Sequence, residues 1–254
     1  MQQWHELETL KGYTLQARDG EIGKITDIWF DDERWTVRYL VLRTGGWLSG
    51  REVLLSPAVV RGVNPAREQL AVDLSREQVE NSPPVEAEQP VSRRYETQLH
   101  HHYGWAPYWM GAGFGALGSI GMDTAQPADE PIEPAHEPSD PHLRSSGEVR
   151  GYGMHARDGE IGEVVDFVIH QEDWSIRYLV ADTRKWLPGR KVLLAPCWVQ
   201  ALHWSEREIV IDMERETLRT APQYDGPRMI DTSYEVHLYQ HYGIAFKQAR
   251  GETA

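Results

Sequence analysis

Cysteine is nearly absent from this chain. The 254 residues include one, Cys197, so no disulfide can form within the chain. Such sparse use suits a reducing compartment. The N-terminal stretch also lacks the basic start and the apolar run of a signal peptide. We therefore predict a cytoplasmic protein, in which Cys197 serves as a small apolar filler.

Basic residues are in deficit as well. Asp and Glu number 39 against 26 Lys and Arg, which gives a formal net charge of −13. This charge repels the phosphate backbone of nucleic acids over long distances. The sequence also has no basic patch interleaved with aromatic residues, the pattern used by proteins that bind single strands. We therefore expect no nucleic-acid partner.

What the sequence does contain is a long internal repeat. The stretch from Gly12 to Pro57 returns 139 residues later as Gly151 to Pro196, with no gap. About 36 of the 93 positions from Gly12 to Gly104 are identical to their partners. A period of this length indicates a duplicated domain, because the units of solenoid proteins are shorter.

Each repeat has the pattern of short strands separated by turns. Asp19-Gly20 favours a tight hairpin turn, and residues 21–30 then form a long strand in which Gly23 suggests a bulge. Further strands are expected at residues 51–55 and 69–74. Five or six short strands with turns between them favour a small barrel over a sandwich.

The strand that begins at Trp35 alternates in polarity. One set of alternate residues is Trp35, Val37, Tyr39 and Val41, and the second repeat has Trp174, Ile176, Tyr178 and Val180 in the same places. Preservation of this set predicts that it faces a core. The opposite set is not wholly polar. We therefore expect a loop or helix to cover part of the outside of the barrel.

Two helices are expected after the strands of the first repeat. Ser75 to Gln78 resembles a capping box that opens a short helix. A second helix is indicated where Tyr95, Leu99, His102 and Tyr103 fall on one helical face. Tyr234, Leu238, His241 and Tyr242 reproduce that face. We expect both of these longer helices to pack on a barrel, with His102 and His241 at the contact.

These patterns divide the chain into three parts. Residues 1–104 and 148–254 are each predicted to be a barrel with a trailing helix. Residues 105–147 are predicted to be a flexible linker, rich in Gly and aromatic residues at first and in Pro and acidic residues later. The fold class is therefore all-β with minor helices, built from two duplicated small barrels joined by a linker.

The ordered motifs resemble the PRC-barrel family. They are G-Y-x-x-x-A-R-D-G-E-I-G, W-x-x-R-Y-L-V and R-x-V-L-L-x-P, and each occurs twice. The family takes its name from the cytoplasmic barrel of the photosynthetic reaction-centre H subunit, and the tandem arrangement is similar to that of tandem PRC-barrel proteins of bacteria. The resemblance implies a small β-barrel used as an adaptor. In the H subunit, such a barrel caps a membrane complex and helps to govern proton delivery.

Aromatic residues outside the strands are the candidate interaction sites. Trp47 and Trp186 share the context W-L-x-G-R in a predicted loop, where each could anchor a partner or plug the end of a barrel. The other candidates, Trp105, Tyr108, Trp109 and Phe114, have no counterpart in the second repeat. They lie in an uncharged stretch, residues 105–122, whose five glycines and one proline argue against a membrane span. A linker and a peripheral membrane or partner-docking segment stay open as alternatives.

No catalytic, cofactor or metal site is predicted. Consecutive helical residues point about 100° apart, so His100-His101-His102 cannot bind one metal ion from a regular helix. Three charged positions recur in both repeats: Asp27 with Asp166, Glu33 with Glu172, and Arg38 with Arg177. None of them has a second catalytic group at a spacing typical of an active site. We interpret them as structural ion pairs and turn contacts. A proton relay through the two aspartates is the alternative.

The leading hypothesis is a non-catalytic interaction module in the bacterial cytoplasm. Its two barrels would pair with each other, with another copy of the chain in a homo-oligomer, or with an unidentified protein. The alternative is a peripheral subunit of a redox or photosynthetic reaction-centre-like complex at the inner membrane, which assists proton transfer or assembly. A hydrolase or isomerase is a weaker third hypothesis. Buried Asp27 and Asp166 with strongly shifted pKa values would favour the proton relay.

Overall fold

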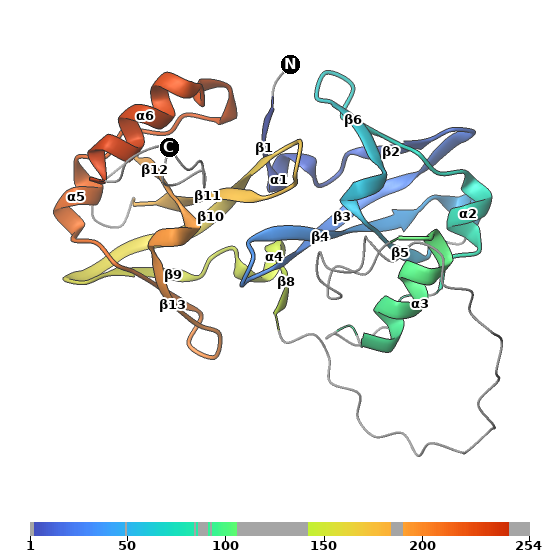
Figure 1. The fold of residues 1–254 in the computed structure, drawn as a ribbon, viewed down its shortest axis with the longest axis horizontal. Coiled ribbons are helices and arrows are strands. Elements are labelled where there is room, and N and C mark those ends of the chain that lie inside the picture. The colour runs from blue at the N-terminus through green and yellow to red at the C-terminus, as the bar shows by residue number, and fades with distance from the viewer. Residues whose placement is uncertain are drawn as a thin grey trace, which may run out of the picture.

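Two similar sheet-rich units make up the chain. The structure is a computed structural model and describes residues 3–48, 50–83, 85, 91, 93–105, 142–183 and 190–243. Figure 1 shows the units next to each other, the first coloured blue to green and the second yellow to red. Strands predominate and the helices are short, which confirms the predicted class of two duplicated strand-rich units with minor helices. Residues 106–141 of the predicted linker lie outside the described residues, and residues 143–147 form a strand and the start of a helix rather than a linker.

The first unit contains six strands of its own. They are β2 (Thr14–Ala17), β3 (Gly20–Asp31), β4 (Thr36–Thr44), β5 (Glu52–Leu55), β6 (Val60–Asn64) and β7 (Gln69–Val72). Hydrogen bonds join them in the order β5-β4-β3-β2-β7-β6. Only β2 and β7 run parallel, since every other neighbouring pair in this order is antiparallel.

The second unit repeats this topology. Its strands are β9 (Gly153–Ala156), β10 (Gly159–His170), β11 (Ile176–Asp182), β12 (Lys191–Leu194), β13 (Val199–His203) and β14 (Glu208–Ile211). Their order is β12-β11-β10-β9-β14-β13, which matches the first unit strand for strand. The duplication that the sequence indicates is therefore a duplication of the whole sheet.

A two-residue hairpin turn connects the first two strands of each unit, as predicted, but its residues are Arg18-Asp19 and Arg157-Asp158, and the following glycine begins the next strand. Ala17 pairs with Gly20 across the β2–β3 hairpin, and Asp19 lies in its two-residue turn. The Asp19 carboxylate also accepts a hydrogen bond from the backbone N–H of Arg76 at 2.9 Å. Because Arg76 opens helix α2 (Arg76–Glu80), the turn fixes the start of that helix on the sheet.

A glycine bulge bends each long strand. The β2–β3 register skips a residue between Glu21 and Gly23, and the second unit repeats the skip before Gly162. A Cβ atom at Gly23 would overlap the backbone carbonyl oxygen of Arg43, and one at Gly162 would overlap that of Asp182. Glycine is needed here because the neighbouring strand passes where a side chain would stand.

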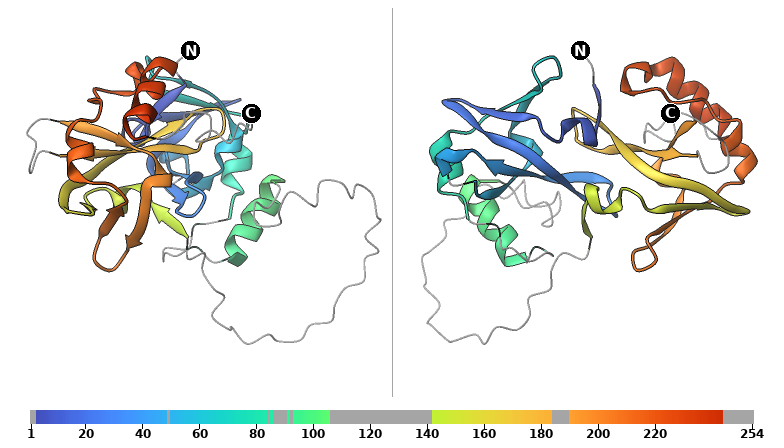
Figure 2. Two further views of the ribbon diagram at one scale, coloured as in Figure 1. Left: turned by 60° about the vertical axis from the view of Figure 1, so that its left-hand side comes forward. Right: turned by 180° about the vertical axis from the view of Figure 1, so that it is seen from behind.

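The two units exchange their leading segments. Strand β1 (Trp4–Glu6) pairs with β10 of the second unit, and β8 (Leu143–Ser145), which leads into the second unit, pairs with β3 of the first. Helices α1 (Leu7–Leu10) and α4 (Ser146–Val149) follow these strands and contact the same sheets. Figures 1 and 2 show all four elements between the units. The exchange is reciprocal, because β1 and β8 occupy equivalent positions 139 residues apart.

The point of symmetry between the units lies at the turns before β4 and β11. Thr36 forms an antiparallel bridge with Ser175, its own duplicate. The backbone N–H of Val37 donates to Trp174 O at 2.9 Å, and that of Ile176 donates to Trp35 O at 2.7 Å. Trp35 and Trp174 both have positive φ, 51° and 54°. This conformation is uncommon for aromatic residues and occurs here where the units are joined.

One hydrophobic core runs through both units. Leu40 and Leu42 of β4 share a cluster with residues of the second sheet, and Phe30 contacts Phe167 across the boundary at a ring distance of 5.2 Å. The alternate set of β4 that was predicted to face a core is buried as predicted, but it is divided between two hydrophobic clusters, with Val37 in the main core. Tyr39 and Val41 are buried, but they lie in a separate outer cluster under helix α3 (Arg93–Tyr103) rather than in the main core.

Cys197 also differs from the prediction. It is exposed, whereas its neighbour Trp198 is buried. Both lie in a short 3-10 turn, residues 196–198, that directs Trp198 inward. Cys197 is therefore not a filler of the core.

Helices close each unit after its last strand. In the first unit α2 and α3 follow β7, and in the second α5 (Arg215–Arg219) and α6 (Thr232–His241) follow β14. Tyr95 and Leu99 of α3 are buried, as the predicted helical face requires. The imidazole of His102 lies 2.8 Å from Gln78 O, and that of His241 lies 2.7 Å from Thr217 O. These histidines therefore hydrogen-bond to the preceding helix of their own unit.

We predict that Ser75→Ala lowers the free energy of unfolding by about 1 kcal/mol. The Ser75 hydroxyl accepts from Gln78 N at 3.2 Å and Gln78 Oε1 accepts from Ser75 N at 2.9 Å, so the predicted capping box is present. Glu214 occupies the equivalent position and makes no side-chain cap. Glu214→Ala is the matched control and should change stability little in a urea titration. Equal effects of the two substitutions would contradict the prediction.

Candidate functional site

Asp27 and Asp166 occupy equivalent positions where the exchanged segments meet the sheets. Asp27 lies on β3 beneath β8 and α4, and Asp166 lies on β10 beneath β1 and α1. Each carboxylate accepts a backbone N–H from the arriving helix, from Gly147 at 3.4 Å and from Glu8 at 3.1 Å. The sequence identifies both aspartates as a repeated pair, and the structure places both at the contact between the units.

The side chains around Asp27 neutralise its charge. Ser145 Oγ donates to it at 2.5 Å, Ser146 Oγ donates at 3.3 Å, and Lys11 Nζ lies 3.1 Å away. Burial alone would raise the pKa of Asp27, but the Ser145 hydrogen bond and the Lys11 charge outweigh it and hold the pKa below its usual value. This carboxylate is therefore ionised when the contact is formed.

The surroundings of Asp166 differ in charge. The position equivalent to Ser145 is Glu6, and the position equivalent to Gly147 is Glu8. Asp166 is 9% exposed. Burial raises the pKa of Asp166 to about 7, the two backbone N–H groups of Phe167 and Glu8 lower it, and the charges of Glu6 and Glu8 raise it further. Within the described residues, no Lys, Arg or His forms an ion pair with Asp166.

The nearby cations bind Glu8 instead. Lys11 Nζ lies 2.7 Å from the Glu8 carboxylate, and Arg150 donates to it at 2.9 Å. Arg150 is the duplicate of Lys11, so the two equivalent cations converge on one glutamate. The half-buried Asp27 thus has a compensating cation and hydroxyl donors, and the buried Asp166 has no compensating cation among the described residues.

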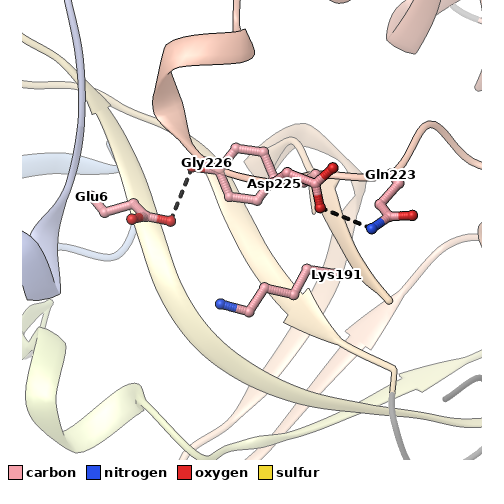
Figure 3. Close-up of a pocket in the computed structure, with 6 residues that line it drawn as sticks. Glu6, Lys191, Gln223, Asp225 and Gly226 are labelled. Atoms are coloured by element: carbon pink, nitrogen blue, oxygen red, sulfur yellow. Dashed lines mark hydrogen bonds between the residues drawn. The ribbon is translucent and has the colours of Figure 1, made fainter. Parts of the chain in front are cut away.

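A cavity of about 340 Å³ opens beside Glu6 on the second unit. Figure 3 shows Glu6 reaching toward it from β1 and Lys191 from β12, with Gln223 and Asp225 on the opposite loop. The Tyr224 hydroxyl donates to Glu6 at 3.0 Å, and burial is the main reason that the pKa of Tyr224 lies far above its usual value. The cavity is polar and open. Glu6 lines it and also belongs to β1, the strand that joins the first unit to the second.

A tyrosine and a glutamate are buried under each closing helix. The Tyr39 hydroxyl donates to Glu96 of α3 at 2.8 Å, and Tyr178 donates to Glu235 of α6 at 2.9 Å. His100 lies 3.2 Å from the Tyr39 hydroxyl. In each unit this hydrogen bond joins strand and helix in a buried place, where a polar group without a partner would be costly. The pairs explain how the helices are held on the sheets.

Another cavity, of about 410 Å³, lies in the first unit between helix α3 and the sheet. Tyr39, Ala58, His100 and Trp105 are among its lining residues. Trp105 is half-buried and stacks on Tyr103 with ring centres 4.3 Å apart. Among the predicted interaction residues, Trp105 is the one whose side chain the structure describes. Tyr108, Trp109, Phe114 and Trp186 lie outside the described residues, and so does the side chain of Trp47.

Arg38 and Arg177, another repeated pair of charged positions singled out in the sequence, each form an ion pair with an aspartate. Arg38 donates to Asp31 and Arg177 to Asp173, both at 2.7 Å. Across the described parts of the chain, no group of three or more His, Cys, Asp or Glu residues could hold a metal ion. Nor is any helix in those parts long and apolar enough to cross a membrane.

Sequence reasoning missed Glu6, Glu8, Ser145 and Ser146. Their segments, residues 4–11 and 143–150, are equivalent in the structure but share little sequence. The repeat becomes recognisable only from Gly12, so neither segment was assigned to it. The signal that could have found them is the constant offset of 139 residues. It makes Leu10 and Val149 equivalent positions, and both are buried.

A comparison with known families agrees with the topology. The PRC-barrel domain matches at residues 5–79, from β1 through most of α2. Residues 5–79 are a PRC-barrel domain. The second unit repeats the strand order of this PRC domain, which is consistent with a tandem PRC-barrel protein. No curated protein matches the chain.

Proposed function

We propose that this tandem PRC protein is a non-catalytic adaptor of the bacterial cytoplasm that binds a protein partner with its two units acting as one body. The reciprocal strand exchange carries the proposal. Because β1 and β8 each complete the sheet of the other unit, the units share one core and cannot turn freely. A joined pair presents a fixed surface, and binding to a fixed surface loses less conformational entropy.

The faces beside the two closing helices differ, which supports a partner that binds one face. In the first unit, the cavity of about 410 Å³ lies there with Trp105 at its wall. In the second unit, Trp198 packs against Tyr239 and Tyr242 at ring distances of 5.7 and 4.3 Å. An accessible tryptophan beside a cavity is typical of a binding anchor. We therefore assign partner binding to the first unit.

A second candidate is a peripheral subunit of a membrane redox complex that assists proton transfer. The raised pKa of Asp166, about 7, favours it, because a group that titrates near neutral pH can accept and release protons. Asp27 argues the other way, since Lys11 and Ser145 lower its pKa. The two aspartates therefore do not form a matched relay, and the adaptor stays the preferred proposal.

Affinity capture from the native host distinguishes these proposals. The tagged full chain would be recovered after mild cross-linking, separately from the soluble and membrane fractions. We expect a soluble protein partner whose recovery falls at least about tenfold with Trp105→Ala, the scale of a binding hot spot. Deletion of residues 105–122 should abolish recovery, and deletion of residues 123–140, of equal length, is the control.

Other outcomes have distinct meanings. Recovery of a membrane complex that depends on residues 105–122 would support the peripheral subunit. Capture of a second copy of the chain alone would indicate a homo-oligomer and contradict the adaptor.

A further inference from the structure

The two exchanged segments meet their sheets with the same geometry but with different chemistry. Around Asp27, two serine hydroxyls and Lys11 compensate a half-buried carboxylate. Around Asp166, the equivalent positions bring two carboxylates, those of Glu6 and Glu8. A buried charge without a compensating partner weakens the contact that buries it, whereas the protonated acid does not.

We propose that β1 and α1 form a proton-sensitive latch on the second unit, which closes when Asp166 is protonated and loosens when Asp166 loses its proton to solvent, while β8 and α4 stay closed on the first unit. The latch goes beyond the adaptor proposal, because it concerns how the joined pair opens. It also does not depend on which partner binds.

The groups that face Asp166 determine the direction of the effect. They are Glu6 from β1, Glu8 from α1 and the Tyr224 hydroxyl from the loop after α5. Lys11 and Arg150 are both bound to Glu8. Lys191 lies across the cavity from Glu6. In the closed contact the pKa of Asp166 is raised from its ordinary value of 3.8 to about 7, chiefly by burial. The closed contact therefore binds the proton more tightly than the open one. Its strength is greatest at low pH and falls as the pH rises from about 4 to about 7.

His5 on β1 titrates in the opposite direction. Its side chain is 4% exposed and lies 2.9 Å from Gln171 Oε1. Burial lowers the pKa of His5 from 6.5, and the Gln171 hydrogen bond opposes this only in part. The closed contact therefore favours neutral His5 and weakens as the pH falls below 6.5. The two effects partly cancel in the native chain, so the test must isolate Asp166 by comparing variants at each pH.

Hydrogen exchange of the full chain provides that comparison. Protection of residues 3–10 reports the latch, and protection of residues 143–150 reports the equivalent contact. We expect Asp166→Asn to be more protected than the native chain at residues 3–10. After correction for the intrinsic exchange rate, the protection factor of Asp166→Asn divided by that of the native chain should grow about tenfold between about pH 6 and pH 8. The titration of His5 cancels in this ratio, because His5 is the same in both proteins.

Asp27→Asn is the matched control in the equivalent contact. It should reduce protection of residues 143–150 by the same factor at both pH values, because the pKa of Asp27 is lowered and the carboxylate is ionised throughout. Glu6→Gln keeps an acceptor for Tyr224 but removes one charge near Asp166, so it should also raise protection of residues 3–10 at pH 8. It serves as the second variant if Asp166→Asn does not fold.

Three results would overturn the latch. Protection of residues 3–10 in Asp166→Asn could equal or fall below that of the native chain at pH 8. The ratio could stay constant with pH. The change could also spread equally over every strand of the second sheet, which would show global unfolding rather than local opening.

Discussion

Gly162→Ala is expected to lower the free energy of unfolding by more than about 4 kcal/mol. Two physical effects add at this position. Gly162 has a φ of +138°, a conformation that residues with a side chain rarely adopt, and its new Cβ would overlap the carbonyl oxygen of Asp182. Backbone atoms of a paired strand cannot move aside without breaking the ladder between β10 and β11. Chemical denaturation with circular dichroism measures the loss.

Two other glycines separate the contributions. Gly23 is the duplicate of Gly162, and a Cβ there would overlap Arg43 O without the positive φ. Gly226 has a φ of +128° with nothing within 4 Å of a new Cβ, so it carries the backbone strain alone. We expect Gly226→Ala to cost about 1–3 kcal/mol and Gly23→Ala to cost more. Similar small losses for all three would show that the strands can separate easily at the bulge.

The fold of each unit follows from local patterns in the sequence. The hairpin turns, the glycine at the bulge and the capping box at Ser75 all specify structure within a few residues, and each is present as predicted. The repeat shows each of these patterns a second time, except for the capping box, which supports the same structural prediction independently. Local rules could not decide which side of β4 faces the main core, because both of its faces are apolar and both are covered.

The contact between the units could not be predicted in the same way. Residues 4–6 and 143–145 are short strands whose partners lie far away in the chain, and neither pairs within its own unit. A strand of three residues carries too little periodicity to show its partner. The charge difference between Asp27 and Asp166 is likewise invisible from the repeat, since the two positions are identical and only their distant neighbours differ.

Trp4→Ala should lower the free energy of unfolding by about 3–5 kcal/mol, as for other buried large aromatic residues. Trp4 is 7% exposed although it lies near the start of the chain. Its ring lies 4.9 Å from His170 and 6.0 Å from Tyr178, both on the second unit. Leu143, the equivalent residue of β8, is only half-buried, so Leu143→Ala should cost less. Thermal or urea unfolding of the full chain measures both.

A double-mutant cycle shows to which unit Trp4 is bound. With exchange, Trp4 pairs with His170, so Trp4→Ala and His170→Ala should be coupled by about 0.5–1.5 kcal/mol. Without exchange, Trp4 would lie against Asp31, which is the residue equivalent to His170. Coupling of Trp4→Ala to Asp31→Ala, with none to His170→Ala, would therefore contradict the exchange. Because β1 then could not close on β10, the same result would remove the basis for both the joined body and its latch.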